Sequence, residues 1–240
     1  RQRPFRAPHH TASAVALVGG GSNPGPGEIS LAHKGVLFLD EFPEFQRRVL
    51  EVLREPLESG EIMISRANRQ VCFPASFQLI AAMNPCPCGY LGDLQRHCCC
   101  TPDQIRRYRD RVSGPLLDRI DLQLNINRLP VGTLSNRKDQ PEASAVVQQR
   151  VIQSRQRQLE RANKANAQLN NEDIAQYCAL SRENERLLEQ AVDRLKLSPR
   201  AYHRILRVAR TIADLDDQTC IGENHLGEAI SYRAMDKDPF

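Results

Sequence analysis

The stretch Gly35-Val36-Leu37-Phe38-Leu39-Asp40-Glu41 decides the fold that we expect for this chain. Its four consecutive apolar residues, 36–39, predict a strand that is buried on both faces of a parallel sheet. Two carboxylates follow at the point where such a strand ends. Because open α/β sheets bind their ligands at the carboxyl ends of strands, this edge is the first candidate for a functional site.

The adjacent acids Asp40 and Glu41 need a reason to stand together, because like charges at close range repel. A bound cation or a reacting water would supply that reason. In a nucleotide hydrolase the first acid positions Mg²⁺ and the second polarises the attacking water. The alternative is a strand that runs into a solvated acidic turn.

The composition is that of a globular protein. The chain has 240 residues, of which 40% are hydrophobic and 26% are charged, and this length suits one large or two modest domains. No apolar run has the length of a membrane span, and the first residues lack a signal-peptide core. The cytoplasmic location that we expect rests on the cysteines, whose local cluster is typical of a reducing compartment. The net charge of +4 permits a nucleic-acid partner without requiring one.

A second apolar run, residues 77–83, predicts a neighbouring strand that ends at Asn84-Pro85. A carboxamide at this edge could donate a hydrogen bond to a terminal phosphate or orient the attacking water. An asparagine that only starts a turn before proline is the simpler alternative.

Two segments predict insertions. Residues 61–65 and 70–73 predict a β-hairpin with Arg66 and Arg69 at its tip. The tip is either a solvated turn or, in a ring around a polyanion, a contact to the phosphate backbone. Residues 19–27 hold five glycines and two prolines and predict a loop. No Gly-Lys-Ser/Thr follows them, so they are not a phosphate-binding P-loop.

Five of the eight cysteines lie between positions 86 and 100, which is not the spread of a secreted disulfide scaffold. Two Cys-x-Cys pairs separated by nine residues stand out: Cys86, Cys88, Cys98 and Cys100. Four thiolates could hold a tetrahedral Zn²⁺, although the usual knuckle has the wider spacing Cys-x-x-Cys. A structural zinc and reduced, unliganded thiols both remain open.

The second half of the chain reads as helical. A short final strand is expected at 122–126, a linker at 129–143 and helices throughout 144–240. The first helix, 144–168, has its apolar stripe at Val147, Val151, Ile152 and Leu159. A further short strand is expected earlier in the chain, at 28–31.

Two arginines occupy positions from which a guanidinium can reach an anion. Arg119 lies between a short helix and the expected final strand, and an ion pair with Asp118 or Asp121 is its alternative role. Arg200 lies at a helix N-terminus, where the helix dipole does not favour a cation, which suggests a nearby anion such as a nucleotide phosphate. Simple solvent exposure is the alternative for Arg200.

In combination these motifs match one family. GVLFLDE, the segment ESGEIMISRANRQVCFPASFQLIAAMNPCPCG, the run RYRDRVSGPLLDRIDL and LSPRAYHRILRVARTIADL together resemble the AAA+ ATPases of the magnesium-chelatase-like ComM/YifB group. The opening RPFRAPHHTASAVALVGGG also resembles that group. The resemblance implies an α/β fold in residues 1–128, a partial AAA+ P-loop core with a parallel sheet and β-hairpin insertions. An α-helical lid over 144–240 would follow it.

The resemblance also implies ATP and Mg²⁺ as cofactors and a role for each site residue. Asp40 and Glu41 are similar to the Walker B pair, for Mg²⁺ and for water activation. Asn84 is similar to the sensor 1 asparagine. Arg119 is similar to the arginine finger that acts on nucleotide held by a neighbouring subunit, and Arg200 to the sensor 2 arginine of the lid.

At the level of the whole protein, the resemblance implies a ring, most simply a hexamer, that hydrolyses ATP. DNA is the implied partner, with branch migration in natural transformation as the role, and the hairpin with Arg66 and Arg69 would point into the ring channel. One alternative is a chelatase-type motor that acts on a protein partner, and another is a zinc-stabilised module without catalysis. The Walker A loop and a Lon-like domain are expected to precede residue 1, so this chain alone is expected not to hydrolyse ATP.

Overall fold

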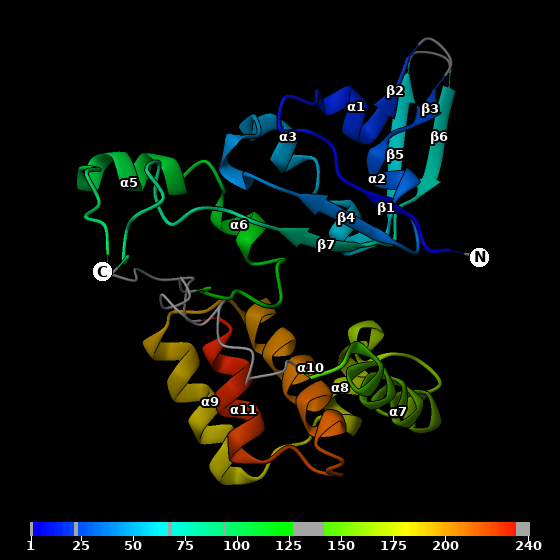
Figure 1. Ribbon diagram of the computed structural model, residues 1–240. Coiled ribbons are helices and arrows are strands. Elements are labelled where there is room, and N and C mark those ends of the chain that lie inside the picture. The colour runs from blue at the N-terminus through cyan, green and yellow to red at the C-terminus, as the bar shows by residue number, and fades with distance from the viewer. Residues whose placement is uncertain (1, 22–23, 67–68, 94, 127–141, 234–240) are drawn as a thin grey trace. The chain divides into compact units, whose positions relative to one another are not determined.

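The computed structural model describes residues 2–21, 24–66, 69–93, 95–126 and 142–233. Contacts divide the chain into two compact units, Arg1–Ile120 and Asp121–Phe240. The first unit is α/β and the second is helical, which confirms the predicted fold class (Figure 1). The predicted linker 129–143 lies outside the described residues except for its last two positions.

Three parallel strands form the sheet of the first unit, in the order β1-β4-β7 (Figure 1). They are β1 (Phe5–Arg6), β4 (Val36–Leu39) and β7 (Gln78–Ala81). The decisive apolar run is therefore the central strand, as its composition predicts. Leu37 and Leu39 are fully buried. Val36 and Phe38 are only half-buried, and Phe38 stacks on the exposed ring of Phe5, so the prediction of burial on both faces is wrong.

The close approach of β1 to β4 depends on Gly35. The N–H of Val36 donates to the carbonyl of Pro4 at 2.9 Å. A Cβ at position 35 would lie 1.9 Å from the same carbonyl oxygen, so no other residue fits without displacing β1. An ion pair also holds β1 in place. Arg6 of β1 donates from Nε and Nη2 to the two carboxylate oxygens of Glu28, both at 2.6 Å.

The core of the first unit gathers side chains from the sheet, the hairpin β5–β6 and the helices around them. Those helices are α1 (Ala14–Val18), α2 (Glu28–Leu31), η1 (Phe42–Glu44), α3 (Arg47–Glu51), α4 (Pro56–Ser59) and α6 (Gly114–Leu117). The predicted strand at 28–31 is wrong, because α2 occupies these residues. Ile29 and Ala32 are buried while Leu31 is exposed, and a spacing of three fits a helical face rather than a strand.

Two antiparallel hairpins interrupt the parallel sheet. The predicted hairpin is confirmed as β5 (Glu61–Arg66) and β6 (Arg69–Pro74), which lie side by side in Figure 1. A smaller one joins β2 (Gly19–Gly20) to β3 (Gly25–Pro26) within the glycine-rich segment. A Cβ on Gly19 would lie 2.2 Å from the carbonyl oxygen of Gly25, which is why this crossing takes glycine.

The segment 122–126 forms no strand, so that prediction is also wrong. The N–H of Gln123 donates to the carbonyl of Tyr232 in the second unit at 2.9 Å. Leu122, Leu124 and Ile126 are exposed, Ile126 at 86%. Alternation of apolar residues predicts a strand only where a neighbouring strand accepts it, and here the contact is made with the end of a helix.

The second unit packs its helices around α10 (Pro199–Leu215). Its other elements are α7 (Ser144–Ala162), η3 (Asn166–Gln168), α8 (Asn171–Tyr177), α9 (Arg182–Arg194) and α11 (Glu223–Ser231). Side-chain caps begin three of these helices, from Asn170, Ser181 and Ser198. Among the helices described here, none combines the length and the apolar composition needed to cross a membrane.

Helix α7 presents the opposite face from the one predicted. Its apolar stripe is exposed, from 36% at Val147 to 53% at Val151. Its buried residues are the polar Ser154 and Gln158 instead. The reason is that α7 packs on α10 through hydrogen bonds and ion pairs rather than through apolar side chains.

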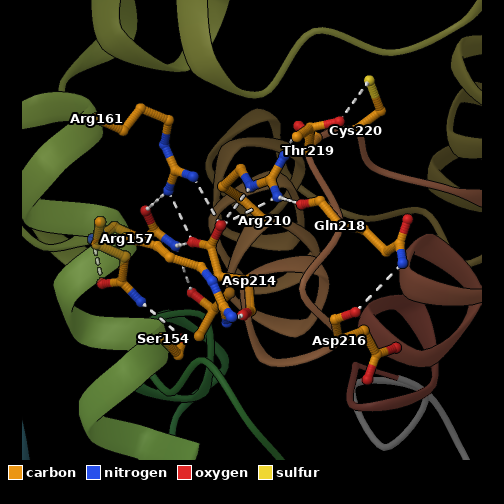
Figure 2. A network of polar contacts seen from close by, with 12 residues as sticks. Ser154, Arg157, Arg161, Arg210, Asp214, Asp216, Gln218, Thr219 and Cys220 are labelled. Atoms are coloured by element: carbon orange, nitrogen blue, oxygen red, sulfur yellow. Dashed lines mark hydrogen bonds and ion pairs between the residues drawn. The ribbon is translucent and has the colours of Figure 1, made fainter.

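Asp214 of α10 is the centre of that polar contact (Figure 2). Its carboxylate is 1% exposed and accepts from both terminal nitrogens of Arg161, at 2.6 and 2.7 Å. Arg210, from the same helix, donates from Nε at 3.2 Å, and Asn166 donates from Nδ2 at 2.8 Å. Arg157 completes the contact by donating to the Asp214 carbonyl at 2.7 Å.

Substitution of Asp214 by alanine is expected to lower the free energy of unfolding of the helical unit by about 3–5 kcal/mol, because it removes the carboxylate that pairs with the buried Arg210 and the partly buried Arg161. Denaturant titration followed by circular dichroism measures this. The control is Asp217→Ala, which removes an exposed ion pair with Arg157 and is expected to cost less than about 1 kcal/mol. Equal effects of the two substitutions would contradict the role given to Asp214.

Acid is expected to weaken the same unit. Burial raises the pKa of Asp214, but the hydrogen bonds from Arg161 and Asn166 and the charge of Arg210 outweigh burial and hold the pKa below its ordinary value. The lowered pKa contributes stability above the ordinary aspartate pKa of about 4, and this stability is lost as the pH falls through the lower folded value. The unfolding midpoint of the wild type should therefore fall with acidification below about pH 4, and that of Asp214→Ala should fall less.

Candidate functional site

The site is built where β4 and β7 end side by side. The two parallel strands pair Leu39 with Ala81. The ladder continues past them, because the N–H of Ala82 donates to Leu39 and the N–H of Phe42 donates to Ala82, both at 2.9 Å. The residues that follow each strand therefore emerge at the same edge of the sheet, as the topology of parallel strands requires.

Asp40 and Glu41 occupy the turn from β4 into η1. Both are exposed, and Glu41 has a left-handed backbone with φ 51° and ψ 44°. A left-handed conformation is uncommon for a residue with a side chain and has a cost. The turn is held by the N–H of Glu41, which donates to Asp40 Oδ1 at 2.9 Å. The pair thus presents its carboxylates outward from a strained but fixed turn.

A histidine that the sequence analysis did not assign to the site lies against the acid pair. His10 Nδ1 lies 2.7 Å from Glu41 Oε2. Its ring also meets Phe45 edge-on, with centroids 6.4 Å apart, and lies 4.1 Å from the ring of His9. His10 and Glu41 lie 31 residues apart in the sequence, so no local sequence pattern predicts their contact. His10 restricts the carboxylate of Glu41, which is still 55% exposed.

Asn84 follows β7 at the same edge and is exposed. Its amide lies beside Gly89, since a Cβ at Gly89 would be 3.8 Å from Asn84 Cγ. Arg109 of α5 (Pro102–Arg109) donates from Nε and Nη2 to the carbonyl of Pro85 at 3.2 and 3.1 Å. Burial raises the pKa of the Tyr108 hydroxyl, while the backbone of Asn84 opposes this increase by hydrogen bonding to it. Helix α5 therefore anchors the backbone around Asn84.

The four cysteines predicted as metal ligands come together in the segment between β7 and α5. Their sulfur atoms all lie within 4.8 Å of one another. Cys99, which lies between two of them, is exposed and outside the group. The structure thus selects the same four thiols as the spacing of the sequence.

Arg119 does not project outward as predicted. Its side chain is only 10% exposed and is held by its own unit. Nε donates to the carbonyl of Arg54 at 3.0 Å, Nη1 to the carbonyl of Pro115 at 2.7 Å and Nη2 to Glu58 Oε2 at 2.7 Å. These two carbonyls and one carboxylate hold the guanidinium against its own unit, and the contact to the carboxylate is charge-assisted.

Three further predicted residues, Arg200, Arg66 and Arg69, are described by the elements that carry them. Arg200 belongs to the second unit, where it is exposed in the first turn of α10, immediately after Pro199. Arg66 and Arg69 form the last paired positions of the β5–β6 hairpin. The residues between them, 67 and 68, lie outside the described part of the chain.

Two models of one protein family match this chain. The family model for magnesium chelatase, subunit ChlI, matches residues 1–134, and the model for the ChlI C-terminal region matches residues 141–233. The chain belongs to the magnesium chelatase ChlI family. Within this family it is similar to the competence protein ComM of Haemophilus influenzae, with 57% identity over 236 residues. It is also 56% identical over 238 residues to the uncharacterized protein YifB of Escherichia coli.

A more distant family member confirms the extent of the match. The uncharacterized protein Mb2921c of Mycobacterium bovis is 42% identical over 235 residues. These three matches cover 98%, 99% and 96% of this chain but 46% of each relative. The chain therefore spans about half the length of the curated family members that it matches.

Replacement of Arg119 by alanine is expected to lower the free energy of unfolding of the α/β unit by about 1–3 kcal/mol, because it strips partners from two carbonyls and a carboxylate. Chemical denaturation of Arg119→Ala and of the wild type measures the difference in the free energy of unfolding. Arg106→Ala is the matched control, since Arg106 also pairs with a carboxylate at 2.7 Å but both partners are about 70% exposed. Its removal should leave stability nearly unchanged. Unaltered stability of Arg119→Ala would show that the contacts described here carry no weight.

Proposed function

We propose that this member of the magnesium chelatase family supplies the water-activating edge of a Mg²⁺-dependent ATPase. The observation that carries the proposal is the emergence of Asp40, Glu41 and Asn84 at one edge of a parallel sheet, from the ends of adjacent strands. The family match and the resemblance to Walker B and sensor 1 residues support it.

The side chains at this edge fit Mg²⁺. It prefers oxygen ligands and keeps several waters, so one or two carboxylates at an exposed position suit it. Asp40 is the residue proposed to hold it, because Asp40 comes directly after the strand and is exposed. Bound there with ATP, the ion would neutralise charge that develops on the phosphate oxygens.

Glu41 is the proposed base. Its carboxylate is more than half exposed, so it can accept a hydrogen bond from a water, while His10 at 2.7 Å limits its rotation. Asn84 is proposed to orient that water or the terminal phosphate through its amide. Since Arg109 of α5 holds the carbonyl of Pro85, the backbone that carries Asn84 is already positioned before substrate arrives.

Two arginines are proposed to complete the site in a ring, most simply a hexamer. Arg119 would act on nucleotide bound by the neighbouring subunit, a role that can raise the rate by several orders of magnitude. To do so it must release Arg54, Pro115 and Glu58, which hold it in this structure. Arg200 would approach the nucleotide from the helical unit.

DNA is the proposed partner of the ring, with branch migration or a related helicase activity as the outcome. The name of the Haemophilus influenzae relative, competence protein ComM, supports a role in DNA uptake and recombination. The β5–β6 hairpin, with Arg66 and Arg69 at its last paired positions, is the proposed contact to the phosphate backbone. A chelatase-type motor that acts on a protein partner is the second candidate, favoured by the family description itself.

In the full-length protein, Glu41→Gln is expected to lower kcat for ATP hydrolysis by at least about 10²-fold, because it removes the base but keeps the shape. ATP binding should persist. The control is Glu44→Gln, three residues on, which pairs with Arg111 at 2.8 Å and should keep normal turnover. If Glu41→Gln kept the wild-type kcat, Glu41 would not be the base. A full-length wild type that does not hydrolyse ATP at all would favour a non-catalytic, zinc-stabilised module.

The partner is tested by DNA binding of the full-length protein at several salt concentrations. The double variant Arg66→Ala/Arg69→Ala is expected to bind more weakly and to reduce the slope of log K against log salt by about 1.8 for duplex DNA, if both arginines meet phosphates. The matched control Arg47→Ala/Arg48→Ala removes two exposed charges from α3 and should have little effect. If the wild type did not bind DNA and its rate of ATP hydrolysis did not change when DNA was added, a protein partner would be favoured.

A further inference from the structure

The segment between β7 and α5 is held together by sulfur rather than by a hydrophobic core. Its described residues, 82–93 and 95–101, form neither helix nor strand. Among them only Cys86 is buried. A segment of this length without secondary structure needs another source of order, because the burial of apolar surface cannot supply it here. The thiol cluster is at its centre and consists of Cys86, Cys88, Cys98 and Cys100.

The spacing of the sulfur atoms matches ligands of one metal ion. Cys86 Sγ lies 3.4 Å from Cys88 Sγ and 3.6 Å from Cys98 Sγ, and the last two sulfurs are also 3.6 Å apart. A tetrahedral zinc with Zn–S bonds of about 2.3 Å places its sulfur ligands roughly 3.8 Å apart. A disulfide would need about 2.05 Å, and all four cysteines are free.

Backbone N–H groups of the same segment are directed at two sulfur atoms of the thiol cluster. The N–H of Cys100 donates to Cys98 Sγ at 3.4 Å. The backbone N–H groups of Tyr90 and Cys99 are directed at Cys88 Sγ. The N–H of Gly89 donates to the carbonyl of Cys86 at 3.0 Å, which closes the turn that holds Cys86 and Cys88. Such N–H donors to sulfur are the outer contacts that orient metal ligands and reduce the cost of their charge.

We propose that the thiol cluster binds one structural Zn²⁺. Four soft sulfur donors in this arrangement favour zinc over magnesium or calcium, and four protein ligands leave no position for a substrate or a catalytic water. The ion would tie the end of β7 to the start of α5, whose first residue is Pro102. It would also fix the turn at Gly89, against which the amide of Asn84 lies. Only this last link, to Asn84, rests on the proposed function.

The metal content of the purified full-length protein tests the site directly. Elemental analysis should find about one zinc per chain in the wild type and at least a ten-fold loss in Cys88→Ser/Cys100→Ser. Cys99→Ser is the matched control, because Cys99 stands between two cluster residues but lies outside the group, and it should keep its zinc. A folded wild type without metal, or one carrying iron instead, would overturn the proposal.

A second measurement keeps the test valid if the double variant fails to fold. Mercurial titration of the wild-type thiols should release zinc in step with the modification of four cysteines, and a chromogenic chelator detects the released ion. After exchange, Co²⁺ in the wild type should show the visible bands and the sulfur charge-transfer absorption of tetrahedral thiolate coordination. Absence of these bands in a protein that takes up cobalt would exclude the thiol cluster as the ligand set.

The outcome is separable from that of the ATPase proposal. Glu41→Gln should retain its full zinc content whatever happens to ATP hydrolysis. Zinc in both proteins together with unchanged hydrolysis in Glu41→Gln would leave the metal site standing and remove the proposed catalysis. Loss of the ATPase proposal and loss of the zinc proposal therefore have different signatures.

Discussion

The pairing of β4 with both of its neighbours is the constraint on which the α/β unit depends. Leu37 and Leu39 are fully buried in the apolar core of the unit, and β1 and β7 flank their strand. On one side the pairing needs Gly35, since a side chain there would collide with Pro4. On the other side it brings the residues after Leu39 and after Ala81 to the same edge. The packing of the core and the position of the candidate site are thus consequences of one ladder of backbone hydrogen bonds.

The helical unit follows a different principle. Its apolar core surrounds α10, but α7 joins it through buried polar groups that converge on Asp214. Such contacts are directional, so they fix one arrangement of α7 where apolar contacts would tolerate several. They also free the apolar stripe of α7, which is left exposed in this chain. The inversion explains how a helix rich in arginine and glutamine becomes part of a packed unit.

Much of this architecture could be predicted from the sequence, wherever a sequence pattern was long or its residues were chemically specific. The strand that ends at Asp40, the β5–β6 hairpin and the thiol cluster each follow from local composition and spacing. Short apolar runs were ambiguous, and residues 28–31 became a helix because Ile29 and Ala32 share a helical face. The most serious failures involve contacts between distant segments.

Contacts between distant segments left no local trace. Nothing near His10 indicates Glu41, and nothing near Arg119 indicates Glu58. Likewise, the face of α7 that is buried was decided by Asp214, more than fifty residues further along. A pattern of hydropathy describes which face of an element could be covered. It does not predict which polar residues from distant segments will pack against that face.

The burial of the charges around Asp214 has a consequence for ionic strength. Dissolved salt screens charges over about 10 Å at 0.1 M, but only where ions can approach, and a carboxylate with 1% exposure gives them little access. Exposed pairs such as Arg106–Asp103 lose their attraction as salt is added. The helical unit therefore keeps its internal packing across concentrations that dissociate polyanions from surface arginines. Dissociation of a nucleic acid by salt can then be interpreted as loss of surface contacts rather than as loosening of this half of the protein.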